Sequence, residues 1–294
     1  MKQKILAGIV LYNPDIERLL ENIKAAISQV DCVVLIENGS TSFEYKQHLV
    51  LNERLVLIEN PRGMGIAYAL NQVMAYGKKN GFEWVLTLDQ DSVIIPGLIA
   101  TYREYTGDNV AIVCCNIIDR NFLIAENCKN VDSEEVNWCI TSASLTSVKA
   151  WEKVGGFDSS MFIDWVDTDI CISFRNAGYK IIKTYKTKLI HELGTNTSIK
   201  KFFKWDVYVL NRPAFRYYYV ARNLIYLGRK HKNISVYQKF KESLLTLFSV
   251  LYFEGNKYEN FKAITKGIID GFIMPVSKPR IDDVLVEISQ NNSI

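Results

Sequence analysis

Residues 82–92 read FEWVLTLDQDS, and this stretch decides the fold. An apolar run begins at Trp84 and stops abruptly at two aspartates, Asp89 and Asp91, which flank Gln90. An apolar run of this length, ended by turn-forming residues, is typical of a strand buried on both faces of a sheet. The aspartates then either cap a turn or hold a positively charged group at the end of the strand.

Three similar apolar runs precede this strand, and each also ends in polar residues. Strands are expected at 4–12, 32–37, 54–59 and 82–89, and helical spacing of apolar residues separates them at 16–28 and about 65–79. This alternation predicts an α/β fold, with a mostly parallel sheet covered by helices on both faces. Since ligands bind outside the carboxyl ends of such strands, the polar strand ends predict a binding crevice.

The alternation breaks after residue 107. Shorter strands are expected at 110–118 and 136–147, a helix is expected from near Trp165, and helices rich in aromatic and basic residues are expected from about 200 onward.

The composition fits a globular protein with a sizeable core, since 48% of the 294 residues are hydrophobic. Six cysteines lie mostly in apolar runs without a CxxC pair, which predicts reduced core residues in a cytoplasmic protein. The longest apolar stretch outside the strands, at 244–253, is shorter than the roughly 20 residues of a spanning helix. We therefore expect a soluble protein or one peripheral to a membrane.

Basic residues concentrate near the C-terminus. Residues 200–266 carry fourteen lysines and arginines against four acids, which predicts an anionic partner. No recognised nucleic-acid module organises these residues, so nucleic acid is not expected as a partner. The alternatives are a solvated helix face, self-association into a homodimer through the C-terminal helices, and attachment to an anionic membrane surface, which the interleaved aromatics favour.

A glycine-containing segment at 62–71, RGMGIAYALN, resembles a dinucleotide-binding fingerprint only in part. Tyr68 stands where the third glycine is needed, and the segment follows the third strand instead of the first. Gly63 and Gly65 more plausibly let the start of a helix approach a ligand phosphate or base.

A second acidic cluster, FIDWVDTDICISFRNAGYKI, spans 162–181 and contains Asp164, Asp167 and Asp169 near the start of a helix. Acids are favoured there as caps and by the helix dipole, which is the simplest interpretation. A carboxylate beside Trp165 is also suited to act as a general base. His191 ends the apolar run TKLIH, and it is either a structural residue or a third metal ligand beside Asp89 and Asp91.

Taken in order, these motifs resemble glycosyltransferase family 2, with a GT-A fold, and most of all its bacterial rhamnosyltransferase-like branch. The resemblance rests on VLYN, ENGS, GIAYALN, LDQDS, the 162–181 cluster and HELG, and continues in RYYYVARNLIYL at 216–227. It implies a catalytic domain at 1–199, with a nucleotide-binding half at 1–107 and an acceptor and catalytic half at 108–199, followed by a C-terminal helical region at 200–294.

The resemblance also implies roles for single residues. Contacts to the nucleotide-sugar donor, a dTDP- or UDP-sugar, are implied for Tyr12, Asn13, Glu37, Asn38, Ser40, Arg62, Asn71, Asp89, Gln90 and Asp91. The family usually has Asp at the position of Glu37, which puts the base contact there in doubt. Asp89, Asp91 and His191 would bind Mg²⁺ or Mn²⁺, and Asp167 would be the catalytic base. The acceptor side would include Trp165, Asp164 and Asp169.

The function implied is a metal-dependent, inverting transfer of a sugar, with rhamnose from dTDP-rhamnose as the specific expectation. The acceptor would be a glycan or a lipid-linked glycan of bacterial polysaccharide or cell-wall synthesis, at the inner face of the plasma membrane. The alternatives are transfer of another sugar, such as galactose, glucose or galactofuranose, and a nucleotide-sugar-binding or scaffolding protein of the same fold without turnover.

Overall fold

The computed structural model describes residues 3–119, 131–191, 198–202, 205–209 and 211–276. They form two compact units. The first holds the chain up to Ser159 and resumes at Asp167 through the last strand of the main sheet; the second holds Ser160–Val166 and the elements from β10 to α8. The sequence placed residues 160–166 inside the catalytic domain, whereas their contacts assign them to the C-terminal unit.

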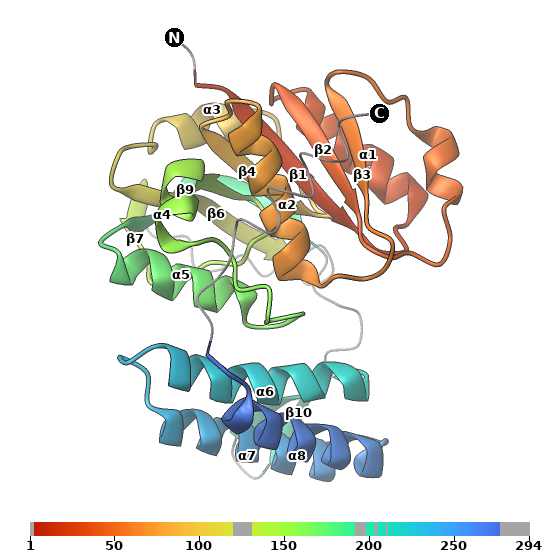
Figure 1. Ribbon diagram of the computed structural model, residues 1–294, viewed down its shortest axis with the longest axis vertical. Helices are drawn as coiled ribbons and strands as arrows, with labels where there is room; N and C mark the ends of the chain where they lie inside the picture. Colours follow the sequence, from red (N-terminus) through yellow and green to blue (C-terminus); the bar gives the residue numbers. More distant parts are fainter. Residues whose placement is uncertain (1–2, 120–130, 192–197, 203–204, 210, 277–294) are drawn as a thin grey trace. The chain divides into compact units, whose positions relative to one another are not determined.

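The first unit is built on one mixed sheet of nine strands in the order β3-β2-β1-β4-β8-β6-β9-β5, with β7 paired to β9 (Figure 1). Its parallel half contains the four expected strands: β1 (Ile5–Leu11), β2 (Cys32–Glu37), β3 (Leu55–Glu59) and β4 (Trp84–Asp89). The other half contains β5 (Val93–Ile94), β6 (Val110–Asp119), β7 (Ser133–Glu135), β8 (Ser144–Ser147) and β9 (Lys180–His191). The predicted α/β class and these four parallel strands are confirmed.

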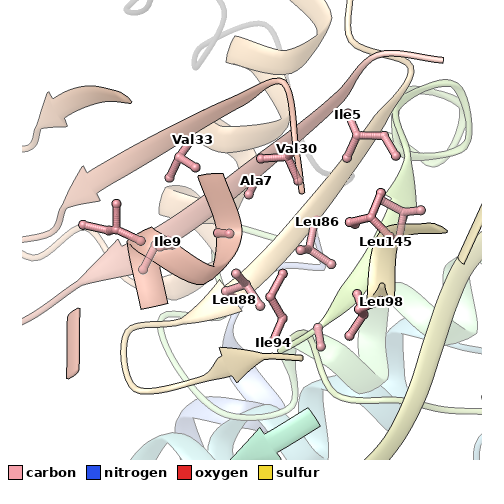
Figure 2. Close-up of a cluster of buried hydrophobic side chains, with 14 of the residues drawn as sticks. Ile5, Ala7, Ile9, Val30, Val33, Leu86, Leu88, Ile94, Leu98 and Leu145 are labelled. Atoms are coloured by element: carbon pink, nitrogen blue, oxygen red, sulfur yellow. The ribbon is translucent and has the colours of Figure 1, made fainter. Parts of the chain in front are cut away.

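Helices cover both faces of the sheet. They are α1 (Ile16–Ile27), α2 (Ile66–Lys79), α3 (Leu98–Arg103), α4 (Val148–Val154) and α5 (Val166–Asn176), with a 3₁₀ turn η1 at Glu44–His48. Alternate residues of β1 face opposite layers. Ile5, Ala7 and Ile9 enter a core shared with β2, β4, α1 and α3 (Figure 2).

The strand expected at 136–147 is shorter in the structure, where only Ser144–Ser147 forms β8. Ala143, with φ 54°, lies in the left-handed region that a strand cannot contain. The five cysteines in the described part of the chain are free and buried, as expected for reduced core residues.

Besides Ser160–Val166, the second unit contains a two-stranded antiparallel hairpin, β10 (Ser198–Phe202) and β11 (Trp205–Val209), where helix was expected. Three helices follow: α6 (Ala214–Lys230), α7 (Val236–Phe253) and α8 (Lys257–Ile273). Gly267 and Gly271 let α8 pack directly on α6, because a Cβ at Gly267 would lie 2.3 Å from the carbonyl oxygen of Tyr218. Across the described helices, no segment combines the length and apolarity needed to cross a membrane.

The packing of α2 on β1 gives a test of this fold. A Cβ added to Gly8 would lie 2.1 Å from Cγ1 of Val73, so we expect Gly8→Ala to lower the free energy of unfolding by about 1–3 kcal/mol. Val73→Ala removes the clashing methyl groups, so the double variant should lose less stability than the two single losses added together. Chemical denaturation measures all three, and Gly107→Ala is the control because its Cβ would meet nothing closer than 3.9 Å. Additive losses would contradict this packing.

Candidate functional site

The carboxyl ends of the parallel strands form the candidate site. The register pairs Leu11 of β1 with Glu37 of β2, and Val10 with Asp89 of β4. The turns that follow these three strands therefore leave the sheet at the same edge, as the sequence predicted. Hydrogen bonds between side chains and backbone then fasten one turn to the next.

Gln90 joins the first turn to the aspartate turn. The backbone N–H of Tyr12 donates to its Oε1 (2.9 Å), and its Nε2 donates to the carbonyl oxygen of Tyr12 (3.2 Å). The side-chain amide of Gln90 thus pairs with both the N–H and the carbonyl oxygen of Tyr12, as the backbone of a neighbouring strand would. Gln90 was expected among the donor contacts, and the structure shows that its amide holds the Tyr12 turn in place.

The backbone of Asp89 is anchored from two further elements. Its carbonyl oxygen accepts from Asn22 of α1 (2.8 Å), and its N–H donates to Oγ of Ser142 (3.1 Å). Ser142 also donates to Oγ of Ser92 (2.8 Å). The strand end and the turn after it are therefore fixed, and the side chains of Asp89 and Asp91 are half-buried at this edge.

The turn after β2 is organised around Glu37. Its buried carboxylate accepts from the N–H and Oγ of Ser40 and from the hydroxyl of Tyr45. Burial and the neighbouring Glu37 raise the pKa of Tyr45, which keeps this hydroxyl protonated as a donor. In this structure both carboxylate oxygens of Glu37 bond residues of the protein and so shape the turn.

The same turn is tied to its neighbours through two asparagines. Asn13, with φ 47°, donates its N–H to Oγ of Ser40 (2.8 Å), and its Oδ1 accepts from the N–H of Thr41 (2.8 Å). Asn38 uses its Oδ1 to accept from Met64 N–H (3.0 Å).

Gly39 allows the turn after β2 to lie against the loop that follows β3. A Cβ at Gly39 would stand 2.2 Å from the backbone nitrogen of Gly63. Glycine is therefore needed at position 39, where the two loops touch. Arg62 and Tyr12 are exposed on these loops.

Asn71 does not reach this edge as a ligand group. It is buried, its Nδ2 donates to the carbonyl oxygen of Phe157 (2.8 Å), and its Oδ1 accepts from Trp151 Nε1 (2.9 Å) and Phe157 N–H (2.9 Å). These bonds occupy both ends of its amide. We correct its expected donor contact to a structural role in holding the chain after α4.

A hollow of about 620 Å³ adjoins the aspartate turn. It is lined by Asn13, Asp15, Glu17, Arg18, Glu21, Gln90 and Asp91. Four carboxylates face one guanidinium, and that guanidinium pairs with Glu21 (3.2 Å). Asp15, Glu17 and Glu21 were not expected at the site, because Asp15 and Glu17 look like ordinary helix-start residues; Asp15 does accept from Arg18 N–H (2.9 Å).

The strand that ends at His191 lies beside the segment that follows the aspartate turn. β5 begins two residues after Asp91 and pairs with β9 so that Val93 lies opposite Ile190, the residue before His191. The strand pairing thus joins two segments about 100 residues apart, as a shared site requires. The side chain of His191 is not among those that the structure describes.

The acidic cluster divides between the two units. Asp167, half-buried, is the second residue of α5, and its Oδ1 accepts from the N–H of Thr168 (2.8 Å). Asp169 is buried, and Asp164 forms ion pairs with Arg212 and Arg216. Neither is available to an acceptor as expected. Trp165 is half-buried with φ 66°, and Lys239 Nζ lies 5.9 Å from its ring centre.

Comparisons with known proteins agree with this architecture. The model of "Glycosyl transferase family 2" matches residues 7–149. A dTDP-rhamnosyl transferase, RfbF of Shigella flexneri, is 29% identical over 92% of this chain and 96% of its own length.

Solved structures share the fold at low sequence identity. GalNAc-T7 with UDP, GalNAc and Mn²⁺ matches with a TM-score of 0.62 and 11% identity, over 99% of this chain and 57% of its own. This chain thus spans little more than half of that structure. S. aureus TarS residues 1–349 with UDP-GlcNAc matches with a TM-score of 0.55 and 13% identity, over 92% of this chain and 80% of its own. Together with the GT-A sheet and its edge of polar turns, these matches indicate a glycosyltransferase that is similar to glycosyl transferase family 2 over residues 7–149 and to the dTDP-rhamnosyl transferase over most of its length.

Proposed function

We propose that this protein transfers rhamnose from dTDP-rhamnose to a glycan or lipid-linked glycan in bacterial polysaccharide assembly. The observation that carries the transfer reaction is the edge at which the turns after β1, β2 and β4 are bonded together around two aspartates. The choice of rhamnose rests on similarity to the Shigella dTDP-rhamnosyl transferase along nearly the full length of both chains. A screen of nucleotide sugars for release of the nucleoside diphosphate tests the donor, and preference for a galactose, glucose or galactofuranose donor would contradict this choice.

The proposal includes a divalent cation, which Asp89, Asp91 and His191 would hold. Carboxylate oxygens are ligands that Mg²⁺ and Mn²⁺ prefer, and the hollow beside Asp91 is lined by four carboxylates and one arginine. A bare diphosphate would be repelled there, so the charge beside Asp91 suits a metal that accompanies the diphosphate, although the described side chains alone form no group of three metal ligands. When bound, such a metal offsets the charge that develops on the departing nucleoside diphosphate.

Asp167 is the proposed base, at the first turn of α5. It takes the proton from an acceptor hydroxyl while the hydroxyl oxygen bonds to the anomeric carbon of the sugar. The bond from that carbon to the diphosphate oxygen breaks on the opposite face, and its electron pair leaves with the nucleoside diphosphate. One carboxylate acting as a base implies a single displacement with inversion.

Replacing the base should separate catalysis from binding. Asp167→Asn keeps the size of the side chain but cannot take up the proton, so transfer should fall by about 10²–10⁴-fold while dTDP affinity stays within a few-fold. Turnover assays and calorimetry measure the two quantities. Asp108→Asn, at an exposed surface ion pair, is the control. Loss of dTDP binding in Asp167→Asn would make Asp167 a structural residue.

The metal assignment predicts coupled binding. We expect excess EDTA to stop transfer and to weaken dTDP binding, and Mn²⁺ or Mg²⁺ to restore both. Asp91→Asn should lower the affinity for Mn²⁺ measured in the presence of dTDP, because one oxygen ligand of the metal loses its charge. Full activity in excess EDTA would overturn metal dependence.

We also propose which surface of the C-terminal unit attaches to a membrane. Arginines of α6 and of the turn before it bond within the unit: Arg212 and Arg216 bond Asp164, and Arg229 donates to the carbonyl oxygens of Gly271 (2.9 Å) and Met274 (2.7 Å). Apart from Phe215 of α6, the exposed large apolar residues of these three helices lie on α7 and α8. We name as the outer stripe Tyr237, Leu244, Leu245, Phe248 and Tyr252 of α7, which with Lys241 occupy one face of that helix.

The charges of α7 favour an anionic lipid surface as the occupant of the outer stripe. Lys241 lies within the stripe, whereas Glu242, the one acid of α7, pairs with Lys239 (2.8 Å). In a two-fold dimer through this face each lysine would be buried without a carboxylate partner, which is costly. At a bilayer the same lysine reaches the headgroups while the aromatics enter the interface.

Vesicle binding tests this surface. Leu245 and Phe248 are 66% and 51% exposed, so Leu245→Ser with Phe248→Ser should leave the fold intact and reduce co-sedimentation with phosphatidylglycerol-containing vesicles several-fold. Val50→Ser with Leu51→Ser changes comparably exposed apolar residues of the other unit and should have no effect. Equal loss in both variants would contradict the proposal, and conversion of a dimer to a monomer in light scattering would indicate self-association instead.

A further inference from the structure

Residues of α6 and of the turn before α6 donate hydrogen bonds to the loop that leads into α5. Arg216 donates through Nε to Oδ2 of Asp164 (3.1 Å) and through Nη2 to Oδ1, which also accepts from Nη1 of Arg212 (3.1 Å). The side chain of Asp164 is 9% exposed. A carboxylate offers about four acceptor sites, and three are filled by arginine, which leaves little capacity for an acceptor sugar.

The backbone of the same loop is held by Asn223 of α6, which is fully buried. Its Nδ2 donates to the carbonyl oxygens of Ile163 (2.9 Å) and Asp164 (2.9 Å). Its Oδ1 accepts from Arg222, which also donates to the carbonyl oxygen of Ser160 (2.6 Å). Every polar atom of the Asn223 amide group is therefore committed to this loop or to a residue that binds it.

The conformation of the loop requires such support. Asp164 and Trp165 have φ values of 65° and 66°, in the left-handed region that residues other than glycine rarely adopt. Two successive residues persist there only where surrounding contacts over-determine the backbone. α5 begins at the next residue, Val166, and Asp167 is its second residue. The bonds to Asp164 thus determine the backbone path by which the chain enters the helix that carries Asp167.

We propose that Arg212, Arg216 and Asn223 form a clamp on Asp164 whose role is to position Asp167 for proton removal. This inference rests on the proposed function, in which Asp167 is the base. Asp164 is then a positioning residue and not an acceptor contact. The C-terminal unit contributes to the chemical step through this clamp, separately from any attachment to a membrane.

Single and paired substitutions test the clamp. Asp164→Asn and Arg216→Gln should each lower kcat at least tenfold and leave the affinity for dTDP within twofold. Because both remove the same interaction, the double variant should be no slower than about the worse single variant. Arg216→Lys keeps the charge but loses the two-pronged geometry, so it should be slowed less than Arg216→Gln while remaining folded.

A readout independent of activity is hydrogen exchange of the amides at 163–168. We expect faster exchange there in Asp164→Asn and Arg216→Gln, with unchanged protection in the main sheet. Glu152→Gln is the control, since Glu152 pairs with Lys78 (2.7 Å) in the other unit. It should change neither exchange at 163–168 nor kcat.

The outcomes separate the inference from its premise. Faster exchange with unchanged kcat would overturn the positioning role, as would a raised acceptor KM with normal kcat in Asp164→Asn alone. If Asp167→Asn retained full transfer, the proposed base would fail, and the loss of kcat in clamp variants would no longer be explained by Asp167. Faster exchange at 163–168, together with lowered kcat and unchanged dTDP affinity, supports the clamp.

Discussion

The parallel pairing of β1 with both β2 and β4 is the constraint on which the candidate site depends. It makes three strands end together, so that turns separated by tens of residues in the sequence become neighbours. Pairing alone leaves the turns free to move beyond the last strand bond. The Gln90 amide, Asn13 and Ser142 extend the bonding past the sheet, each with side-chain to backbone hydrogen bonds. Sheet register and turn chemistry together therefore build one surface.

Buried polar residues account for much of what looks like a ligand motif. A buried carboxylate or amide is tolerated only when its hydrogen bonds are satisfied. Glu37 and Asn71 meet this condition entirely within the protein. Motif residues thus divide into those that shape the edge and those, such as the exposed Tyr12 and Arg62, that remain able to contact a ligand.

The sequence predicted the fold well where local pattern decides structure. Apolar runs located the parallel strands, and polar strand ends located the binding edge. It failed where a contact joins distant residues: the partners of Gln90 and Asp164 lie 78 and about 50 positions away. A lone glutamine or aspartate carries no sign of such a partner. The hairpin at β10 and β11 was missed because its aromatic and basic residues also suit a helix face.

The C-terminal unit then has two faces with different chemistry. The arginines of α6 and of the turn before it, read in the sequence as part of a basic surface, are directed at Asp164 and at backbone carbonyls. The apolar surface of α7 stays exposed, with Lys241 as its charge. The C-terminal unit therefore holds the chain at Asp164, three residues before Asp167, and also presents the proposed lipid-facing stripe. For a lipid-linked acceptor, the proposed lipid-facing stripe and the loop that precedes α5, the helix that carries Asp167, belong to one unit and are joined by a covalent path.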